Sequence, residues 1–527
     1  MAVKIILIAL FFAVMIGIGI YCRRQAADVS GFVLGGRKVG PWLTAFAYGT
    51  SYFSAVIFVG YAGQFGWRFG IASTWIGLGN AFIGSLLAWV LLGRRTRIMT
   101  QHLNSATMPQ FFASRFDSRG LKIVSSAIIF IFLIPYTASL YNGLSRLFNM
   151  AFNVDYTICI IVMAVLTAVY VIAGGYMATA INDFIQGLFM LVGIVVIIAA
   201  VLKTNGGFIG SLNALSEVSD PAVSGAPGIF NSFFGPDPAG LLGVVILTSL
   251  GTWGLPQMVQ KFYAIKSEKD INKGTIISTF FALVVAGGCY FLGGFGRLFN
   301  IDVAAEGYDA VIPAMLSTLS PLVVGIALIL VLSASMSTLS SLVLASSSTL
   351  TLDFIAPLMA GKGGKGSAGL QKGSAQQKED QHLLIIRIFV GVFILISAVI
   401  AVIQYKRNIT FIAQLMGLSW GALAGSFLAP FLYSLYWKRT TKVSCIVSFV
   451  WGTTLMLANM FFKSAFPAAL QSPINCGAFA MLSGMVLVPL VSLLSKAPDQ
   501  TFISNVFSCY EQKILVPITE ALSDEEA

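Results

Sequence analysis

A chain of 527 residues is long enough for several soluble domains, but its composition excludes a protein surrounded by water. Hydrophobic residues make up 57% of it, charged residues only 10%, and the mean hydropathy is +0.86, so lipid must be the solvent for most of its surface. The net charge of +11 is therefore interpreted as membrane topology and not as a nucleic-acid-binding surface.

Long apolar windows separated by short polar breaks predict membrane-spanning helices, since a helix needs about 20 apolar residues to cross a bilayer core of roughly 30 Å. We name the first window the leading helix and the next twelve core helices one to twelve. The thirteen windows cover residues 4–22, 41–69, 72–93, 121–150, 154–174, 179–202, 239–262, 273–296, 322–351, 383–405, 409–437, 442–463 and 475–495. The sequence thus predicts an all-α, polytopic membrane protein with about thirteen transmembrane helices.

The leading helix and the basic residues predict the orientation. Arg23 and Arg24 follow the first apolar stretch, and no small-residue cleavage site is evident, which favours an uncleaved helix over a signal peptide. With the N-terminus outside, 24 of the 32 Lys and Arg residues, Lys261 among them, fall on the cytoplasmic side. We therefore expect a multi-pass protein of the plasma (inner) membrane, with its N-terminus outside and its C-terminus in the cytoplasm.

Two core helices are interrupted near the middle of the membrane. Core helix one reads TAFAYGTSYFSAVIFVGYAG, with Gly49, Thr50, Ser51 and Ser54 at its centre, and core helix six reads ILTSLGTWGLPQMVQKF, where two glycines and Pro256 weaken the helix. Carbonyls freed there need a partner that lipid does not provide, such as an ion or a solute. Ordinary glycine packing and a proline kink are the alternative. The two helices begin successive groups of five, as in an inverted repeat.

Asp183 is an ionisable residue close to an apolar window, in the segment GGYMATAINDFIQG. Because a charge inside the bilayer is costly, this residue needs an explanation. It either lines a cavity and assists cation binding or stabilises the first turn of core helix five as a dipole partner.

Core helix eight contains an unusual number of hydroxyl groups, in the segment SASMSTLSSLVLASSS. Ala334, Ser337, Thr338 and Ser341 are spaced i, i+3, i+4 and i+7, so they share one face, and Ser340 flanks it. Sodium is bound through oxygen, and two hydroxyls together with carbonyls of an unwound helix supply such ligands without a carboxylate. A small-residue seam for close helix packing is the alternative.

Five segments together resemble a known family: LGGRKVGPWLTAFAYGTSYFSA, GGYMATAINDFIQG, LPQMVQKFYAIKSEKD, SASMSTLSSL and LSWGALAGSFLAPFLYSLYWKR. In this order, from about residue 30 to 440, they are similar to the sodium:solute symporter family, in the branch of proline, pantothenate and related carriers. The resemblance implies a LeuT-type fold of two inverted five-helix repeats, alternating access and import of a small organic solute with sodium. It implies no enzymatic activity.

The resemblance also implies where the ions bind. One sodium is expected between core helices one and eight, with ligands from Thr50, Phe53, Ala334, Ser337 and Thr338. A second sodium, which only some members of the family use, is expected beside Ser337 at Asp183, Ser340 and Ser341.

The solute is expected to be an amino acid such as proline or a small carboxylate. Proline carriers typically have an acid followed by Met, Ser, Gly and Trp in helix one, whereas this chain reads YFSAV at 52–56. Candidates for lining the solute site, each equally compatible with packing, are Ser54, Phe58, Tyr136, Tyr141, Trp253, Gln257 and Gln414.

The predicted organisation follows from these elements. It comprises a leading helix and cytoplasmic loop (1–40), a first repeat (41–202), an extracellular loop (203–238), a second repeat (239–437) with a cytoplasmic linker (355–382), two accessory helices (438–495) and a cytoplasmic tail (496–527). Lipid and a small solute are the expected partners, with no nucleic acid and no obligatory protein. The alternatives are a proton-coupled carrier of the same fold, a channel and a non-transporting membrane sensor.

Overall fold

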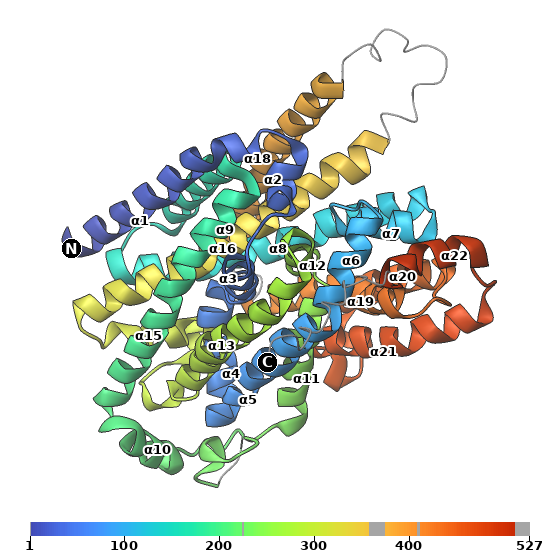
Figure 1. The fold of residues 1–527 in the computed structure, drawn as a ribbon. Helices are drawn as coiled ribbons and strands as arrows, with labels where there is room; N and C mark the ends of the chain where they lie inside the picture. The colour runs from blue at the N-terminus through green and yellow to red at the C-terminus, as the bar shows by residue number, and fades with distance from the viewer. Residues whose placement is uncertain (1, 224–225, 358–374, 408–411, 512–527) are drawn as a thin grey trace, which may run out of the picture.

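The computed structural model describes residues 2–223, 226–357, 375–407 and 412–511, and these are almost entirely helical (Figure 1). The helices are α1 (Ala2–Tyr21), α2 (Val29–Leu34), α3 (Pro41–Tyr52), α4 (Ala62–Phe69), α5 (Thr74–Gly79), α6 (Arg94–His102), α7 (Met108–Phe116), α8 (Arg119–Phe152), α9 (Tyr156–Thr204), α10 (Gly207–Glu217), α11 (Pro238–Leu250), α12 (Pro256–Ala264), α13 (Glu268–Gly293), α14 (Val303–Glu306), α15 (Val311–Ser317), α16 (Pro321–Thr349), α18 (Ala375–Arg407), α19 (Ile412–Tyr436), α20 (Lys442–Phe461), α21 (Pro473–Leu494) and α22 (Gln500–Phe507). An isolated parallel bridge joins Val39 and Ile265.

The predicted interruptions of core helices one and six are confirmed. α3 ends at Tyr52, Phe53 is extended with φ −101° and ψ 103°, and helical structure resumes at Val56 as a π-helical turn that leads into α4. In core helix six, Leu255 is extended between a short 3-10 turn and α12, and the two halves of the span are bent by 41°. Each break follows from local chemistry, since glycine weakens a helix and Pro256 favours the first turn of a new one.

The described residues contain nine helical stretches long and apolar enough to cross a membrane, or ten if the bent pair α11–α12 is one span. Two of these stretches, Val56–His102 and Tyr156–Thr204, have 47 and 49 residues. A straight helix of the latter length is about 75 Å long, more than twice the hydrocarbon core. Gly70 (φ 62°) and Gly175 (φ 55°, ψ −151°) interrupt them. The expected loop between core helices four and five is thus reduced to one glycine, and the count of thirteen stays a prediction.

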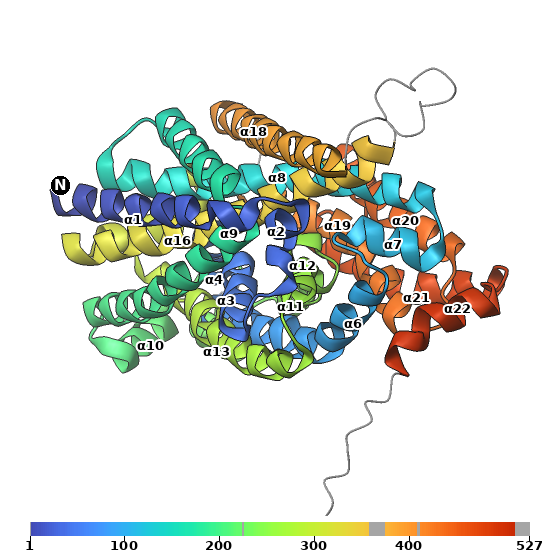
Figure 2. The ribbon, with the colours of Figure 1, turned by 45° about the horizontal axis from the view of Figure 1, so that its top comes forward.

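α16 lies at the centre of the bundle, where it packs against α3, α8, α9 and α18. Every residue from Leu330 to Thr349 is buried. The serines of this helix therefore face other helices and not lipid. α20 and α21 pack on α19 at the end of the molecule opposite α1 (Figure 2).

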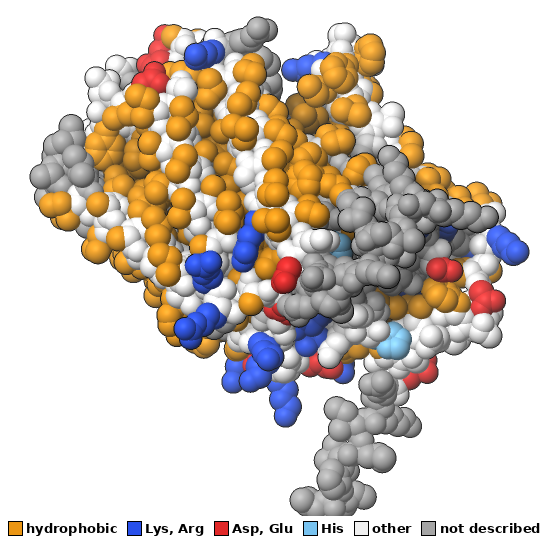
Figure 3. Space-filling view, turned by 90° about the horizontal axis from the view of Figure 1, so that it is seen from above, with side chains coloured by type: hydrophobic (Ala, Val, Ile, Leu, Met, Phe, Trp, Pro, Cys, Tyr) orange, Lys and Arg blue, Asp and Glu red, His pale blue; other side chains and the backbone are white. Residues whose placement is uncertain are grey.

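The outer surface is that of a membrane protein. Figure 3 shows a broad hydrophobic face with charged side chains at its borders. On α9, for example, Ile158, Ile161 and Val165 are more than half exposed. Exposed apolar side chains on this scale require lipid as their solvent.

Three segments predicted as connectors contain helical residues, and in the linker 355–382 these include the first residues of α18, which begins at Ala375. The expected extracellular loop includes α10, and the expected tail includes α22, whose side chains Ile503, Val506 and Phe507 are buried. Both helices are short, with 11 and 8 residues, so neither contains a long apolar stretch from which the sequence would predict it. Most of the linker 355–382 and the last part of the tail, residues 512–527, lie outside the described residues.

Candidate functional site

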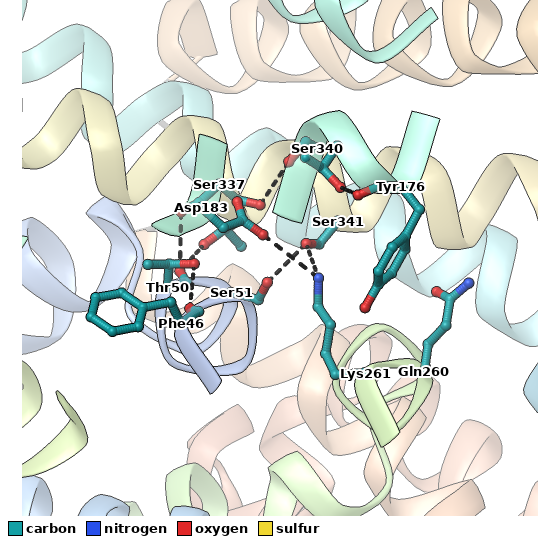
Figure 4. A network of polar contacts seen from close by, with 12 residues as sticks. Phe46, Thr50, Ser51, Tyr176, Asp183, Gln260, Lys261, Ser337, Ser340 and Ser341 are labelled. Atoms are coloured by element: carbon teal, nitrogen blue, oxygen red, sulfur yellow. Dashed lines mark hydrogen bonds and ion pairs between the residues drawn. The ribbon is translucent and has the colours of Figure 1, made fainter. Parts of the chain in front are cut away.

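Oxygen atoms of α3 and α16 converge at the broken end of core helix one (Figure 4). The hydroxyl oxygens of Ser337 and Thr338 each lie 3.2 Å from the Thr50 carbonyl oxygen, and Ser337 Oγ also lies 2.9 Å from the Ser333 carbonyl. The same hydroxyls lie 3.2 and 3.0 Å from the Ala334 carbonyl of their own helix. All of these residues are buried. The structure thus brings together four of the five residues predicted for the first sodium.

Phe53, the fifth predicted ligand, occupies the break itself. It is the first non-helical residue after α3, and its amide still donates to the Gly49 carbonyl at 3.1 Å. Its ring stacks on Tyr52 with 4.4 Å between ring centroids. The break lies only three residues after Thr50, so the chain leaves the helix next to the converging oxygens.

The residues predicted for the second sodium are arranged differently. Ser341 Oγ lies 2.8 Å from Ser51 Oγ and accepts a hydrogen bond of 2.9 Å from Lys261 Nζ. Asp183 Oδ2 is 3.8 Å from the same ammonium. Ser340, by contrast, donates to the Ser337 carbonyl at 2.9 Å, within its own helix.

The position of Asp183 excludes one of its two interpretations. Asp183 lies eight residues after the break at Gly175, and its side chain is 0% exposed. The interpretation of Asp183 as a dipole partner in the first turn of core helix five is therefore wrong, because the dipole effect falls off within that turn. Asp183 lines the interior, opposite α12 and α16 (Figure 4).

Lys261 is the residue that the sequence analysis missed. The charge distribution predicts that Lys261 lies on the cytoplasmic side, but its side chain is only 3% exposed and lies between helices. A signal was present, because Lys261 is five residues after Pro256, about 7.5 Å along a helix that starts at a mid-membrane break. A lysine so close to a break at mid-membrane lies within the hydrocarbon core of roughly 30 Å and not at the membrane surface.

The two broken helices are joined through the π-helical segment Asn80–Leu87. The Gly84 carbonyl accepts hydrogen bonds from Tyr48 at 2.8 Å and Thr252 at 3.1 Å. Thr248 donates to Asn80 Oδ1 at 2.8 Å, and its own carbonyl accepts from Tyr52 at 2.5 Å. A π-helical segment changes the direction of its carbonyls, which lets one segment contact both breaks.

The candidate solute residues are mostly buried. Ser54, Phe58, Tyr136, Tyr141, Trp253 and Gln257 are at most 6% exposed, and Gln414 is half-buried. The Tyr136 ring packs edge-to-face on Trp420 with 5.9 Å between centroids. The Trp253 indole donates to the Ile83 carbonyl at 3.1 Å, which gives this residue a structural contact.

Some of these buried polar groups lack protein partners. Among the described residues, neither the amide nitrogen nor the amide oxygen of Gln257 has a hydrogen-bond partner, and the same holds for the Tyr141 hydroxyl. Buried polar groups are normally paired, and an unmade bond costs about 1–3 kcal/mol. Such groups can pair with a polar solute.

Arg37 connects three segments at the predicted cytoplasmic end of the bundle. Arg37, with φ 56°, donates to the carbonyls of Tyr263 at 3.1 Å, Thr100 at 3.3 Å and Ser105 at 2.5 Å. Burial lowers the pKa of Arg37 to about 10, so its charge persists at neutral pH. One guanidinium thus connects the segment before α3 with α6, with the turn that follows α6, and with α12.

Comparisons with known proteins agree with this geometry. The model of the family described as "Sodium:solute symporter family" matches residues 32–452. The sodium/proline symporter of Staphylococcus aureus (strain JH9) is 32% identical over 463 residues, which cover 86% of this chain and 85% of the relative; the symporter of strain NCTC 8325 gives the same values. A solved structure of a Na⁺-coupled sialic acid symporter, in a substrate-bound outward-open state, has a TM-score of 0.72 at 16% identity, with 94% of this chain and 98% of that one covered.

Proposed function

Because the chain belongs to the sodium:solute symporter family, we propose that it imports a small organic solute together with sodium, by alternating access across the plasma membrane. The chain is a multi-pass membrane protein and a transporter, not an enzyme. The observation that supports the proposal best is the convergence of the Ser337 and Thr338 hydroxyls on the Thr50 carbonyl, at the end of a broken helix.

The proposed sodium ligands are Thr50, Phe53, Ala334, Ser337 and Thr338. Backbone carbonyls and rotatable hydroxyls present oxygen lone pairs to a small cation, and their dipoles need no buried carboxylate. An ion held there connects α3 with α16, which belong to different predicted repeats. Its binding therefore favours those conformations in which the two helices are close.

Transport then follows as a cycle. Sodium stabilises an outward-open state, the solute closes it, and loss of sodium to the cytoplasm permits solute release. The membrane potential contributes about 2.3 kcal/mol for each charge moved across 100 mV. The Arg37 contacts must open for release, since they connect α6 and α12 with the segment before α3 at the predicted cytoplasmic end.

The proposed solute is an amino acid such as proline, or a small carboxylate. The 32% identical relatives are sodium/proline symporters, which supports an amino acid. Ser54 in the first break and Gln257, in the first turn of α12 after the second break, supply polar groups from both broken helices. The segment YFSAV at 52–56 has no acid, so it leaves room for a solute with a negative charge.

Uptake into proteoliposomes tests the function. A panel of labelled amino acids and small carboxylates is offered with an inward sodium gradient, with potassium in place of sodium, and with an inward proton gradient alone. We expect accumulation of at least one solute that requires the sodium gradient and increases with a negative interior. Uptake that persists without sodium and collapses with the pH gradient would instead identify a proton-coupled carrier.

A further inference from the structure

A lysine ammonium is buried inside the helix bundle among groups that suit a cation. Lys261 Nζ lies 2.9 Å from Ser341 Oγ and 3.8 Å from Asp183 Oδ2, and Ser341 in turn contacts Ser51. The ammonium is also 5.2 Å from the centre of the Tyr176 ring, within the range of a cation–π contact. Figure 4 shows the Lys261 side chain extending from α12 towards α9 and α16.

Charge balance explains why these groups are together. A lone carboxylate in this interior costs several kcal/mol, and removing one partner of a buried pair leaves an uncompensated charge. Asp183 is 0% and Lys261 3% exposed, so water does not compensate either charge. The Asp183 carboxylate thus requires one positive charge beside it, and Lys261 supplies that charge.

The oxygens beside the ammonium include two of the three residues that the resemblance suggested for a second sodium. Asp183 and Ser341 contact Lys261, while Ser340 is turned to its own helix. A sodium ion and an ammonium cannot share one carboxylate at this position without strong repulsion.

We propose that Lys261 is a covalently attached cation that permanently occupies this second cation site, so that the protein binds and moves one sodium ion per solute. This inference rests on the proposed function. Asp183, Lys261, Ser341 and Ser51 lie on four different elements, α9, α12, α16 and α3. The attached cation therefore joins the two predicted repeats in the way that a second sodium would, without exchange with either solution.

Sodium binding to the purified full-length protein tests the proposal. Equilibrium dialysis with radioactive sodium should give one ion per chain for the unaltered protein. The variant Lys261→Met replaces the unbranched stem of the lysine but lacks its ammonium, which frees Asp183, so it should bind two ions per chain. In proteoliposomes the charge moved per zwitterionic solute should increase from one to two.

Two further variants keep the test decisive. Lys261→Arg retains the positive charge and should bind one ion. The double variant Asp183→Asn/Lys261→Met removes both charges and should also bind one ion, even where the single variant is too unstable to purify. Two ions in the unaltered protein, two in the double variant, or no additional ion in a folded Lys261→Met compared with the unaltered protein would overturn the proposal.

If the proposed function is wrong, the measurements differ from those expected if only the proposal for Lys261 is wrong. An unaltered protein that binds no sodium and shows no sodium-dependent uptake would refute symport. Lys261→Met would in that case still gain one ion relative to the unaltered protein if the attached cation is correctly assigned.

Discussion

Removal of the Thr338 hydroxyl is the most direct perturbation of the first sodium site. Thr338 Oγ1 lies 3.2 Å from the Thr50 carbonyl and 3.0 Å from the Ala334 carbonyl, and the residue is 0% exposed. In Thr338→Ala the ion loses one of five proposed ligands, and no water replaces it easily in a buried site. A contact between a polar group and a charge is worth about 1.5–3 kcal/mol. Since 1.4 kcal/mol is tenfold, the half-saturating sodium concentration should rise roughly 10- to 100-fold.

Two measurements check this expectation. The first is the sodium dependence of uptake in proteoliposomes, and the second is the sodium concentration that half-maximally raises the melting temperature of the protein in detergent. Thr338→Ser retains the hydroxyl and should stay within about threefold of the unaltered protein. Ser335→Ala is the matched control, because the Ser335 hydroxyl bonds back to the Val331 carbonyl at 2.7 Å within the same helix. An unchanged half-saturating concentration in Thr338→Ala, or an equal shift in Ser335→Ala, would refute the assigned site.

Two further predictions concern stability. A Cβ at Gly66 would lie 2.1 Å from the carbonyl carbon of Gly293, and backbone has little freedom to move, so Gly66→Ala should lower the melting temperature by an amount equivalent to about 1–3 kcal/mol. Gly391→Ala, which meets no atom within 4 Å, should not lower it, and equal losses in both would contradict the close packing. The hydrogen bond from Arg297 lowers the pKa of Asp220, so this ion pair contributes above the usual pKa of the carboxyl and is lost as the pH falls through its lower folded-state value. Asp220→Asn should therefore lower the melting temperature at pH 7 and have little effect below pH 3; the same difference at both pH values would disprove the role of the pair.

The sequence predicted those features of the helices that depend on residues close together in the chain. The breaks at Phe53 and Leu255 follow from glycine, serine and proline within a few positions of each. The shared face of Ala334, Ser337 and Thr338 follows from the period of the helix alone. Their convergence on Thr50 needed the resemblance as well, because no local rule says which helix lies opposite.

The sequence did not predict features of the fold that depend on distant residues, on a single residue or on a short segment. Gly175 turns the chain without a loop, and nothing in GGYMATA distinguishes that glycine from one that stays helical. The ends of the segment 203–238 could be placed, but α10 within it was missed because its apolar pattern is short.

The sequence by itself determined that this chain is a membrane protein, that two of its helices are discontinuous, and that one helix presents a row of hydroxyl groups. Hydropathy, backbone propensity and helical period act over one to a few turns, so they can be read along the chain. Only the tertiary structure decided that the Lys261 ammonium lies against Asp183 and Ser341. Charges on separate helices find each other through the packing of the whole bundle, and no pattern within either segment contains that information.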